Sequence, residues 1–279
     1  MTNKILIPVD GSANSDIAVE YGIYIARKLN STLSALHVMD VNLFQGPMLT
    51  DISGAAVMPP SEGFLDAVEA SLNEKADLIL KSFREHCRWK GLQVETKKVV
   101  GRISETISEE ARDADLIVMA KKGEHFHLKA GGFLGSVAES VIRHAAKPVM
   151  VTPENFLEIE SMAIAYDGSL SAQKALDFSL NLSKQAVWPI TAVIITEDMD
   201  KASKLTTQIE NAAEKEETDC EIIILPGKEG TEILKFIGEG AVELMVMGAY
   251  GHNRLRELLL GSTTSQVIQK SPVPVLLVR

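Results

Sequence analysis

The chain contains one sequence unit twice, and this internal repeat limits its fold more than any other feature. The segment Ile7-Pro8-Val9-Asp10-Gly11-Ser12 is echoed by Ile164-Ala165-Tyr166-Asp167-Gly168-Ser169. The offset of 157 positions holds without gaps down to Leu36-His37-Val38, which matches Val193-Ile194-Ile195. Later landmarks keep the same order, with Gly135-Ser136 against Gly261-Ser262 and Lys147-Pro148-Val149 against Val273-Pro274-Val275. The repeat predicts two copies of one folding unit.

Within each copy, short apolar runs alternate with amphipathic stretches, which is typical of βαβ units around a parallel sheet. After the N-cap candidate Ser12, apolar residues recur from Ile17 to Leu29 at helical spacing. The near-continuous Val, Ile, Leu and Met content of the runs suits strands covered on both faces. Strands are predicted at about 4–9, 33–39, 94–100, 115–120 and 147–152, and again at 162–166, 190–196, 220–225, 243–248 and 273–278.

These patterns predict an α/β protein with a five-stranded parallel sheet in each copy and helices on both faces. We expect one domain over residues 1–153 and a second over 160–279, joined near Pro153-Glu154-Asn155. The segment from Asp40 to Gly63 has almost no counterpart in the second copy. Loops of this length are usually lids or disordered connections, and the sequence leaves both readings open.

The sharpest motif follows the fourth apolar run of the second copy. It consists of Gly248-Ala249-Tyr250-Gly251, nine further residues, and Gly261-Ser262-Thr263-Thr264. Glycine lets the backbone turn tightly and approach a ligand, while the start of the next helix presents N–H groups that favour an anion. Together they would hold a polyphosphate. Asp167 ends the first run, so in a doubly wound sheet it could meet Gly248 beyond the strand ends. Neither a P-loop nor a dinucleotide-binding G-x-G-x-x-G motif is present.

These residues resemble the universal stress protein family, and the resemblance to a tandem member covers both halves from end to end. Its ATP-binding members carry G-x2-G-x9-G-[ST] after the fourth strand and an aspartate after the first. The resemblance implies two flavodoxin-like, adenine-nucleotide α-hydrolase-like domains with strand order 3-2-1-4-5. It also implies that ATP, with ADP or AMP as alternatives, binds together with Mg²⁺.

Carried over position by position, the resemblance implies a set of nucleotide contacts in the second copy. Base and ribose would be surrounded by Ala165, Tyr166, Asp167 and Ile195. Ribose and phosphates would be surrounded by Met247, Gly248, Gly251, His252, Gly261, Ser262, Thr263 and Thr264. The resemblance further implies that the last strands of the two copies pair, giving an internal pseudo-dimer, and it leaves a homodimer of the whole chain open.

The first copy departs from this pattern. Ala120 replaces the first glycine, Gly123 keeps the second, and eleven residues rather than nine precede Gly135-Ser136-Val137. Pro8, Val9, Asp10 and Val38 keep the base and ribose end of a site, whereas phosphate binding there is weakened. Lys121, Lys122 and Lys129 could compensate electrostatically, although solvated lysines are the commoner explanation. His125 and His127 invite a metal hypothesis, but without a recognisable ligand spacing we assign no metal site.

Charge and cysteine content exclude other classes. A net charge of −10 offers no basic surface for nucleic acid, and no apolar stretch is long enough for a membrane helix. The start of the chain lacks a signal-peptide pattern, so we expect a cytoplasmic protein. Cys87 and Cys220 lie far apart without a metal-binding spacing and are expected to be free thiols.

The leading functional hypothesis is a stress-responsive, ATP-binding regulatory protein with an unidentified protein partner. A scaffold that works without nucleotide, through protein contacts or another small ligand, is the alternative. A true ATPase or kinase is the third hypothesis. The loop offers only His252, Arg254, Arg256 and Glu257 to orient a nucleophile, so we assign no catalytic residue and expect slow hydrolysis at most.

Overall fold

The computed structural model describes residues 2–44, 62–124, 134–240, 242–249 and 260–279. The N-terminal half contains β1 (Lys4–Pro8), α1 (Ala13–Leu29), β2 (Thr32–Asp40), α2 (Val41–Phe44), α3 (Glu62–Trp89), β3 (Val94–Gly101), α4 (Ile103–Glu110), a 3-10 turn (Ala111–Asp113), β4 (Leu116–Ala120), α5 (Ser136–His144) and β5 (Val149–Thr152). The C-terminal half contains β6 (Met162–Ala165), α6 (Leu170–Ala186), β7 (Ile190–Ile195), α7 (Met199–Glu216), β8 (Cys220–Leu225), α8 (Glu229–Gly238), β9 (Leu244–Gly248), α9 (Ser262–Lys270) and β10 (Val275–Val278). The α/β prediction is confirmed.

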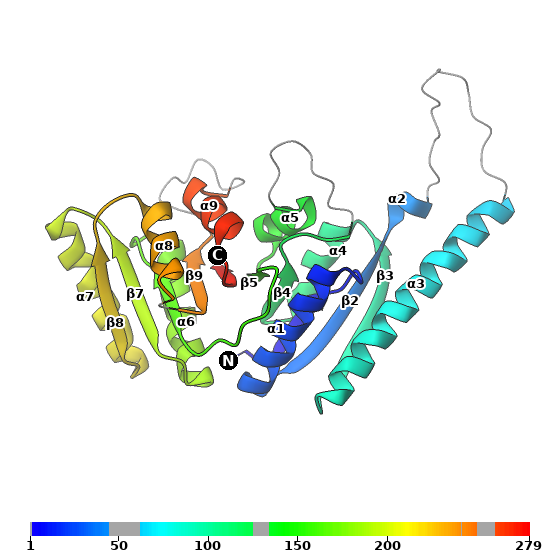
Figure 1. Cartoon of the computed structure of the whole chain (residues 1–279), viewed down its shortest axis with the longest axis horizontal. Helices are drawn as coiled ribbons and strands as arrows, with labels where there is room; N and C mark the ends of the chain where they lie inside the picture. The colour runs from blue at the N-terminus through cyan, green and yellow to red at the C-terminus, as the bar shows by residue number, and fades with distance from the viewer. Residues whose placement is uncertain (1, 45–61, 125–133, 241, 250–259) are drawn as a thin grey trace, which may run out of the picture.

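All the described strands form one ten-stranded sheet in the order β3-β2-β1-β4-β5-β10-β9-β6-β7-β8. Neighbours within each half are parallel. Each half therefore has its first strand in the centre, flanked by its second and fourth strands. The halves join at β5 and β10, which pair antiparallel with Met150 opposite Leu276. Figure 1 shows the two halves side by side on either side of this junction.

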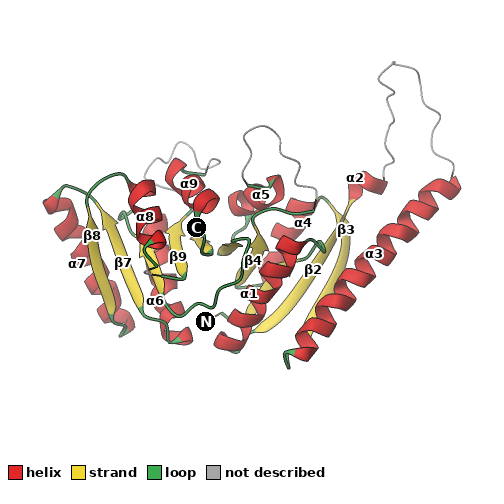
Figure 2. Cartoon of the chain, in the orientation of Figure 1, coloured by secondary structure: helices red, strands yellow, loops and turns green. Residues whose placement is uncertain are grey.

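Helices cover both faces of the sheet (Figure 2). Strands that are apolar on both faces require such cover. One buried cluster packs side chains of α1, α3, α6 and α7 on the sheet, and the other packs side chains of α4, α5, α8 and α9. Both clusters contain residues of both halves, so each face carries a core that continues across the junction. The central strands are buried along most of their length, as Ile5, Leu116 and Met162 illustrate.

The first helix of each half begins and ends in the same way. Ser12 is the N-cap of α1, as predicted, because its side chain accepts a hydrogen bond from Ser15 N at 3.2 Å. Ser169 caps α6 likewise, accepting from Ala172 N at 3.2 Å. Both helices end in a left-handed residue, at Asn30 and Val187. The repeat found in the sequence is therefore a repeat of backbone conformation.

Two connections differ between the halves. The prediction of a loop from Asp40 to Gly63 is partly wrong, because α2 follows β2 directly and Glu62 already belongs to α3; residues 45–61 lie outside the described residues. The connection after β5 carries Phe156, whose ring packs edge-on against Tyr21 and Tyr24 of α1, with centroids 4.8 and 5.9 Å away. The sequence indicated this connection only as a join near Pro153-Glu154-Asn155. In the structure it contributes to the core.

Candidate functional site

The C-terminal site residues are gathered where three neighbouring strands end. β6 lies between β7 and β9, with Ala165 opposite both Val193 and Met247. Parallel strands end at one edge of a sheet, so Tyr166, Ile195 and Gly248 meet there. The strand order thus brings together residues that are far apart in the sequence.

The turn after β6 fixes Asp167 at this edge. Asp167 Oδ1 accepts a hydrogen bond from Ser169 N at 2.9 Å, and Gly168 has φ +81°, a conformation that favours glycine. Tyr166 is buried and its hydroxyl donates to Gln208 Oε1 at 2.9 Å. Burial raises the pKa of the Tyr166 hydroxyl, with a further contribution from the Asp167 charge. The Tyr166 side chain therefore points toward α7, and only the backbone of Tyr166 is left at the strand ends.

Gly248 is required by packing. A Cβ at this position would lie 2.8 Å from Ala172 N and 2.9 Å from the Ser171 carbonyl carbon, both backbone atoms at the start of α6. Any larger residue would push β9 away from this helix. Glycine at 248 is therefore explained by the described fold alone, with or without a ligand.

Gly261 differs in this respect. Among the described residues, a Cβ here would meet only Thr264 Oγ1, at an ordinary 3.7 Å, and φ is −58°. Gly261 is the N-cap residue of α9 and has no side chain to cap it. The first-turn N–H groups of α9 are therefore not capped by residue 261. No contact among the described residues requires this residue to be a glycine.

The described part of the loop contains further polar groups. Ser262 is exposed, and Thr263 Oγ1 donates to Glu229 Oε2, at the start of α8, at 3.1 Å. Thr264 is buried beneath them. Hydroxyls, N–H groups and one carboxylate thus surround the start of α9. Gly251 and His252 lie outside the described residues.

In the N-terminal half Pro8 and Ala120 end β1 and β4, Val9 and Asp10 follow β1, and Val38 lies two residues before the end of β2. In this half Asp10 contacts the loop after β4, because its Oδ2 accepts a hydrogen bond from Glu124 N at 2.7 Å. A Cβ on Gly123 would lie 2.7 Å from the same oxygen. The Asp10 carboxylate therefore already accepts a hydrogen bond from one backbone N–H of this loop.

Gly135, the N-cap residue of α5, has closer neighbours than its counterpart Gly261 has among the described residues. A Cβ there would lie 3.3 Å from Lys121 O, which accepts a hydrogen bond from Gly135 N. Ser136 and Val137 open α5 as Ser262 and Thr263 open α9.

The two described lysines of this loop have partners elsewhere. Lys121 Nζ donates to Gln269 O near the end of α9 in the other half, and Lys122 Nζ donates to Glu154 Oε1 at 3.1 Å. Burial and the neighbouring charge of Lys122 lower the pKa of the Lys121 ammonium, while Glu154 opposes them. Lys121 therefore joins the two halves. Lys129, His125 and His127 lie outside the described residues.

Sequence reasoning missed Glu124, Gln208, Glu229 and Gln269, which contact site residues from other elements. Glu124 and Gln269 contribute backbone atoms, and Gln208 and Glu229 contribute side chains. No local sequence signal identifies either kind of contact. Within the described ranges, no group of three His, Cys, Asp or Glu side chains could hold a metal ion. Cys87 and Cys220 are free, as predicted.

The fold and the placement of these residues define a tandem, doubly wound α/β protein with candidate sites beyond the carboxyl ends of its strands. The sequence profile of the Universal stress protein family matches the chain twice, over residues 1–153 and 158–279. The chain therefore belongs to the universal stress protein family, with two such regions in tandem.

Individual relatives agree with this assignment. A universal stress protein of Synechocystis sp. is 32% identical over 287 residues, covering 99% of each chain. One from Bacillus subtilis is 32% identical over 153 residues, covering 54% of this chain and 99% of the relative. The crystal structure of a universal stress protein from Archaeoglobus fulgidus matches with a TM-score of 0.78 at 24% identity, covering 100% of this chain and 99% of the other, and shows the same fold.

Proposed function

We propose that this protein is an ATP-binding regulatory protein whose C-terminal half holds the nucleotide. Base and ribose lie against Ala165, Tyr166, Asp167 and Ile195, and the phosphates lie at Gly248, Gly261 and the first turn of α9. The observation that carries the proposal is Gly261. No contact among the described residues requires a glycine at this position, and residue 261 has no side chain to cap the start of α9. A phosphate approaching these N–H groups would supply the reason.

The N-terminal half is proposed to bind nucleotide less tightly. Asp10 already accepts from Glu124 N, so a phosphate would have to displace a carboxylate or lie beside a like charge. Lys121 and Lys122 point to Gln269 and Glu154. These contacts support an unequal pair of sites.

Oxygen donors near α9 suit a magnesium ion accompanying the phosphates. The Thr263 hydroxyl and the Glu229 carboxylate stand at the start of α9, and Mg²⁺ prefers oxygen ligands. The ion would offset the charge that Glu229 brings close to the phosphates. We expect slow hydrolysis at most, with ADP and AMP as weaker alternatives to ATP.

We further propose domains at 1–153 and 160–279 that form an internal pseudo-dimer, which the β5–β10 pairing supports. A cytoplasmic location is part of the same proposal. No helix among the described residues is long and apolar enough to cross a bilayer. In this proposal, nucleotide binding alters the contacts that join the halves and thereby the binding of a partner. The hydrogen bond from Lys121 to Gln269 is one of these contacts.

Calorimetric titration of the full chain with ATP and Mg²⁺ tests the proposal through a matched pair of variants. Ser262 and Ser136 are both exposed first residues of corresponding helices, where an added carboxylate favours the helix dipole. Ser262→Asp is therefore expected to keep the fold and to weaken ATP binding at least about tenfold, because its charge meets the phosphates. Ser136→Asp is expected to change the affinity of this site little. Absence of binding to the wild-type chain, or an equal loss in both variants, would overturn the proposal.

A further inference from the structure

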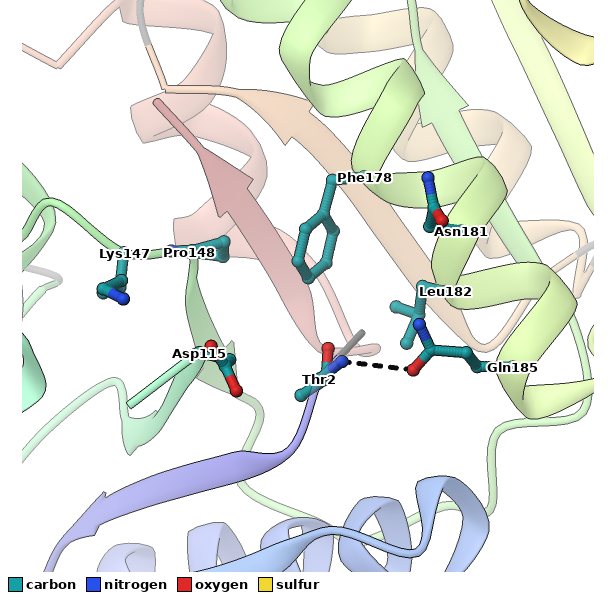
Figure 3. Close-up of a pocket in the computed structure, with 8 residues that line it drawn as sticks. All are labelled: Thr2, Asp115, Lys147, Pro148, Phe178, Asn181, Leu182 and Gln185. Carbon is teal, nitrogen blue, oxygen red and sulfur yellow. Dashed lines mark hydrogen bonds between the residues drawn. The ribbon is translucent and has the colours of Figure 1, made fainter. Parts of the chain in front are cut away.

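A cavity of about 240 Å³ lies between the two halves, at the opposite ends of the strands from the site of the N-terminal half (Figure 3). One wall is the side of α6 that carries Phe178, Asn181 and Gln185. The facing wall consists of Thr2, which precedes β1, Asp115, which precedes β4, and Lys147, which precedes β5. This volume is somewhat below the range of pockets for drug-sized ligands, so an occupant must be small.

The corresponding place in the repeat is filled. By the 157-residue offset, Phe178 and Asn181 correspond to Tyr21 and Tyr24 of α1. There, Phe156 covers both tyrosine rings, and Tyr24 also stacks on Trp188 with centroids 6.3 Å apart. The two positions are therefore built alike, and in the filled one an aromatic ring packs on the helix.

The open copy has lost the groups that bind a polypeptide backbone. In the filled copy, the Tyr21 hydroxyl donates to Asn155 O at 3.2 Å and accepts from Leu157 N at 3.0 Å. The Tyr24 hydroxyl donates to Ile159 O at 2.6 Å. Phe178 and Asn181 have no hydroxyl at these positions. The open copy thus keeps the aromatic surface but not the anchors of the connecting segment, which favours a small molecule over a peptide.

Charge distinguishes the open copy as well. Lys147 stands where the filled copy has Val273. Asp115, the other charged group, has its Oδ2 engaged by Asn3 N at 2.8 Å and Lys4 N at 3.1 Å, as Glu243 Oε2 is engaged by Ser161 N at 2.8 Å. No carboxylate of the described residues lies within ion-pairing distance of the Lys147 ammonium. The cavity lining therefore holds one cation, Lys147, that forms no ion pair with a described residue, and one carboxylate, Asp115, that is held by backbone N–H groups.

We propose that this cavity is a binding site for a small aromatic carboxylate, with the ring against Phe178 and the carboxylate toward Lys147. The amides of Asn181 and Gln185 line the rest of the α6 wall. The site is separate from the proposed nucleotide site, and neither proposal depends on the other.

Benzoate tests this site on the full chain, with benzylamine as a probe of the same ring and the opposite charge. Calorimetry is expected to show benzoate binding with a Kd of about 1 mM, which is reasonable for a ligand of this size. Benzylamine is expected not to bind. Lys147→Gln is expected to weaken benzoate binding about tenfold, the loss of a single charged contact. Lys184→Gln is the matched control, because Lys184 lies on the exposed side of α6, where Nζ donates to Glu216 O.

A filling variant provides a second readout. Asn181→Tyr introduces the ring that the other half carries as Tyr24, and since Asn181 is exposed the fold should tolerate it. This ring is expected to occupy the cavity and to abolish benzoate binding. Equal binding of benzoate and benzylamine, unchanged affinity in Lys147→Gln, displacement of benzoate by ATP, or absence of benzoate binding would each overturn the proposal.

Discussion

Val187 has a strained backbone conformation, and the corresponding position of the first half carries a residue that tolerates the same conformation. It ends α6 with φ 57° and ψ 45°, a left-handed conformation that is costly for a β-branched residue, and its side chain is 83% exposed. The counterpart Asn30 has φ 54° and ψ 44°. Asparagine tolerates this conformation, so Val187→Asn is expected to raise the free energy of unfolding by about 1 kcal/mol, measured by urea denaturation.

The reverse exchange is the control for this prediction. Asn30→Val places a β-branched residue in the same conformation and should lower the free energy of unfolding by a similar amount. If Val187→Asn were neutral or destabilising while Asn30→Val was harmless, strain at these helix ends would not be the explanation.

Cys87 makes stability depend on pH in the alkaline range. Burial, with a smaller contribution from the Glu20 charge, raises the pKa of the Cys87 thiol from 9.0 to about 12. Above pH 9 the unfolded chain releases this proton while the folded chain keeps it, so stability falls as pH rises from about 9 toward 12. The free energy of unfolding should therefore drop between pH 8 and 10 by about 1.4 kcal/mol more in wild type than in Cys87→Ala. Identical losses would show that Cys87 does not titrate in this way.

At the scale of elements, the sequence predicts strands better than the contacts between them. The sequence predicted all ten strands. The central strands were found as continuous apolar runs because both of their faces are buried, whereas the edge strand β3 contains Glu95, Lys97 and Lys98 and is partly exposed. Boundaries were less accurate, since β10 begins at Val275, after Pro274, rather than at 273. The aspartate and glycines of the candidate site were predicted from their spacing. Contacts such as Asp10 with Glu124 join residues 114 positions apart, and no local pattern indicates them.

The connection between the halves acts as a structural element through Phe156. Its ring fills the space over Tyr21 and Tyr24, so Phe156→Ala is expected to lower the free energy of unfolding by about 2 kcal/mol, less than a fully buried phenylalanine would cost. Urea denaturation measures this loss. The neighbouring Leu157 is 51% exposed, so Leu157→Ala should cost about 0.5 kcal/mol or less. Equal effects of the two variants would contradict a packing role for Phe156. ATP affinity should not change in either.

At the scale of the whole molecule, the halves share their cores. Both buried clusters contain residues from each half, and Met150 and Leu276 face each other at 0% exposure in the central strand pair. We therefore expect the full chain to unfold in one cooperative transition, with equal calorimetric and van't Hoff enthalpies in scanning calorimetry.

A proline in the central pair should uncouple the halves. Leu276→Pro removes a backbone donor from β10, which pairs with β5 on one side and β9 on the other. Two separate transitions are expected in this variant. Two transitions in the wild-type chain would contradict a shared core.

The two halves thus share one architecture, and we propose that their sites are unequal. In the N-terminal half Asp10 accepts a hydrogen bond from a loop N–H, and a Cβ on Gly135 would lie 3.3 Å from Lys121 O. A Cβ on Gly261 would meet no such close backbone atom among the described residues. The central claim is that the adenine nucleotide binds in the C-terminal half.

Photolabelling of the full chain with an azido derivative of ATP, followed by peptide mapping, tests this claim most directly. We expect the label in peptides that contain Tyr166 or Ile195, and we expect unlabelled ATP with Mg²⁺ to protect them. Label confined to peptides with Val9 or Val38, or label that excess ATP does not reduce, would contradict it.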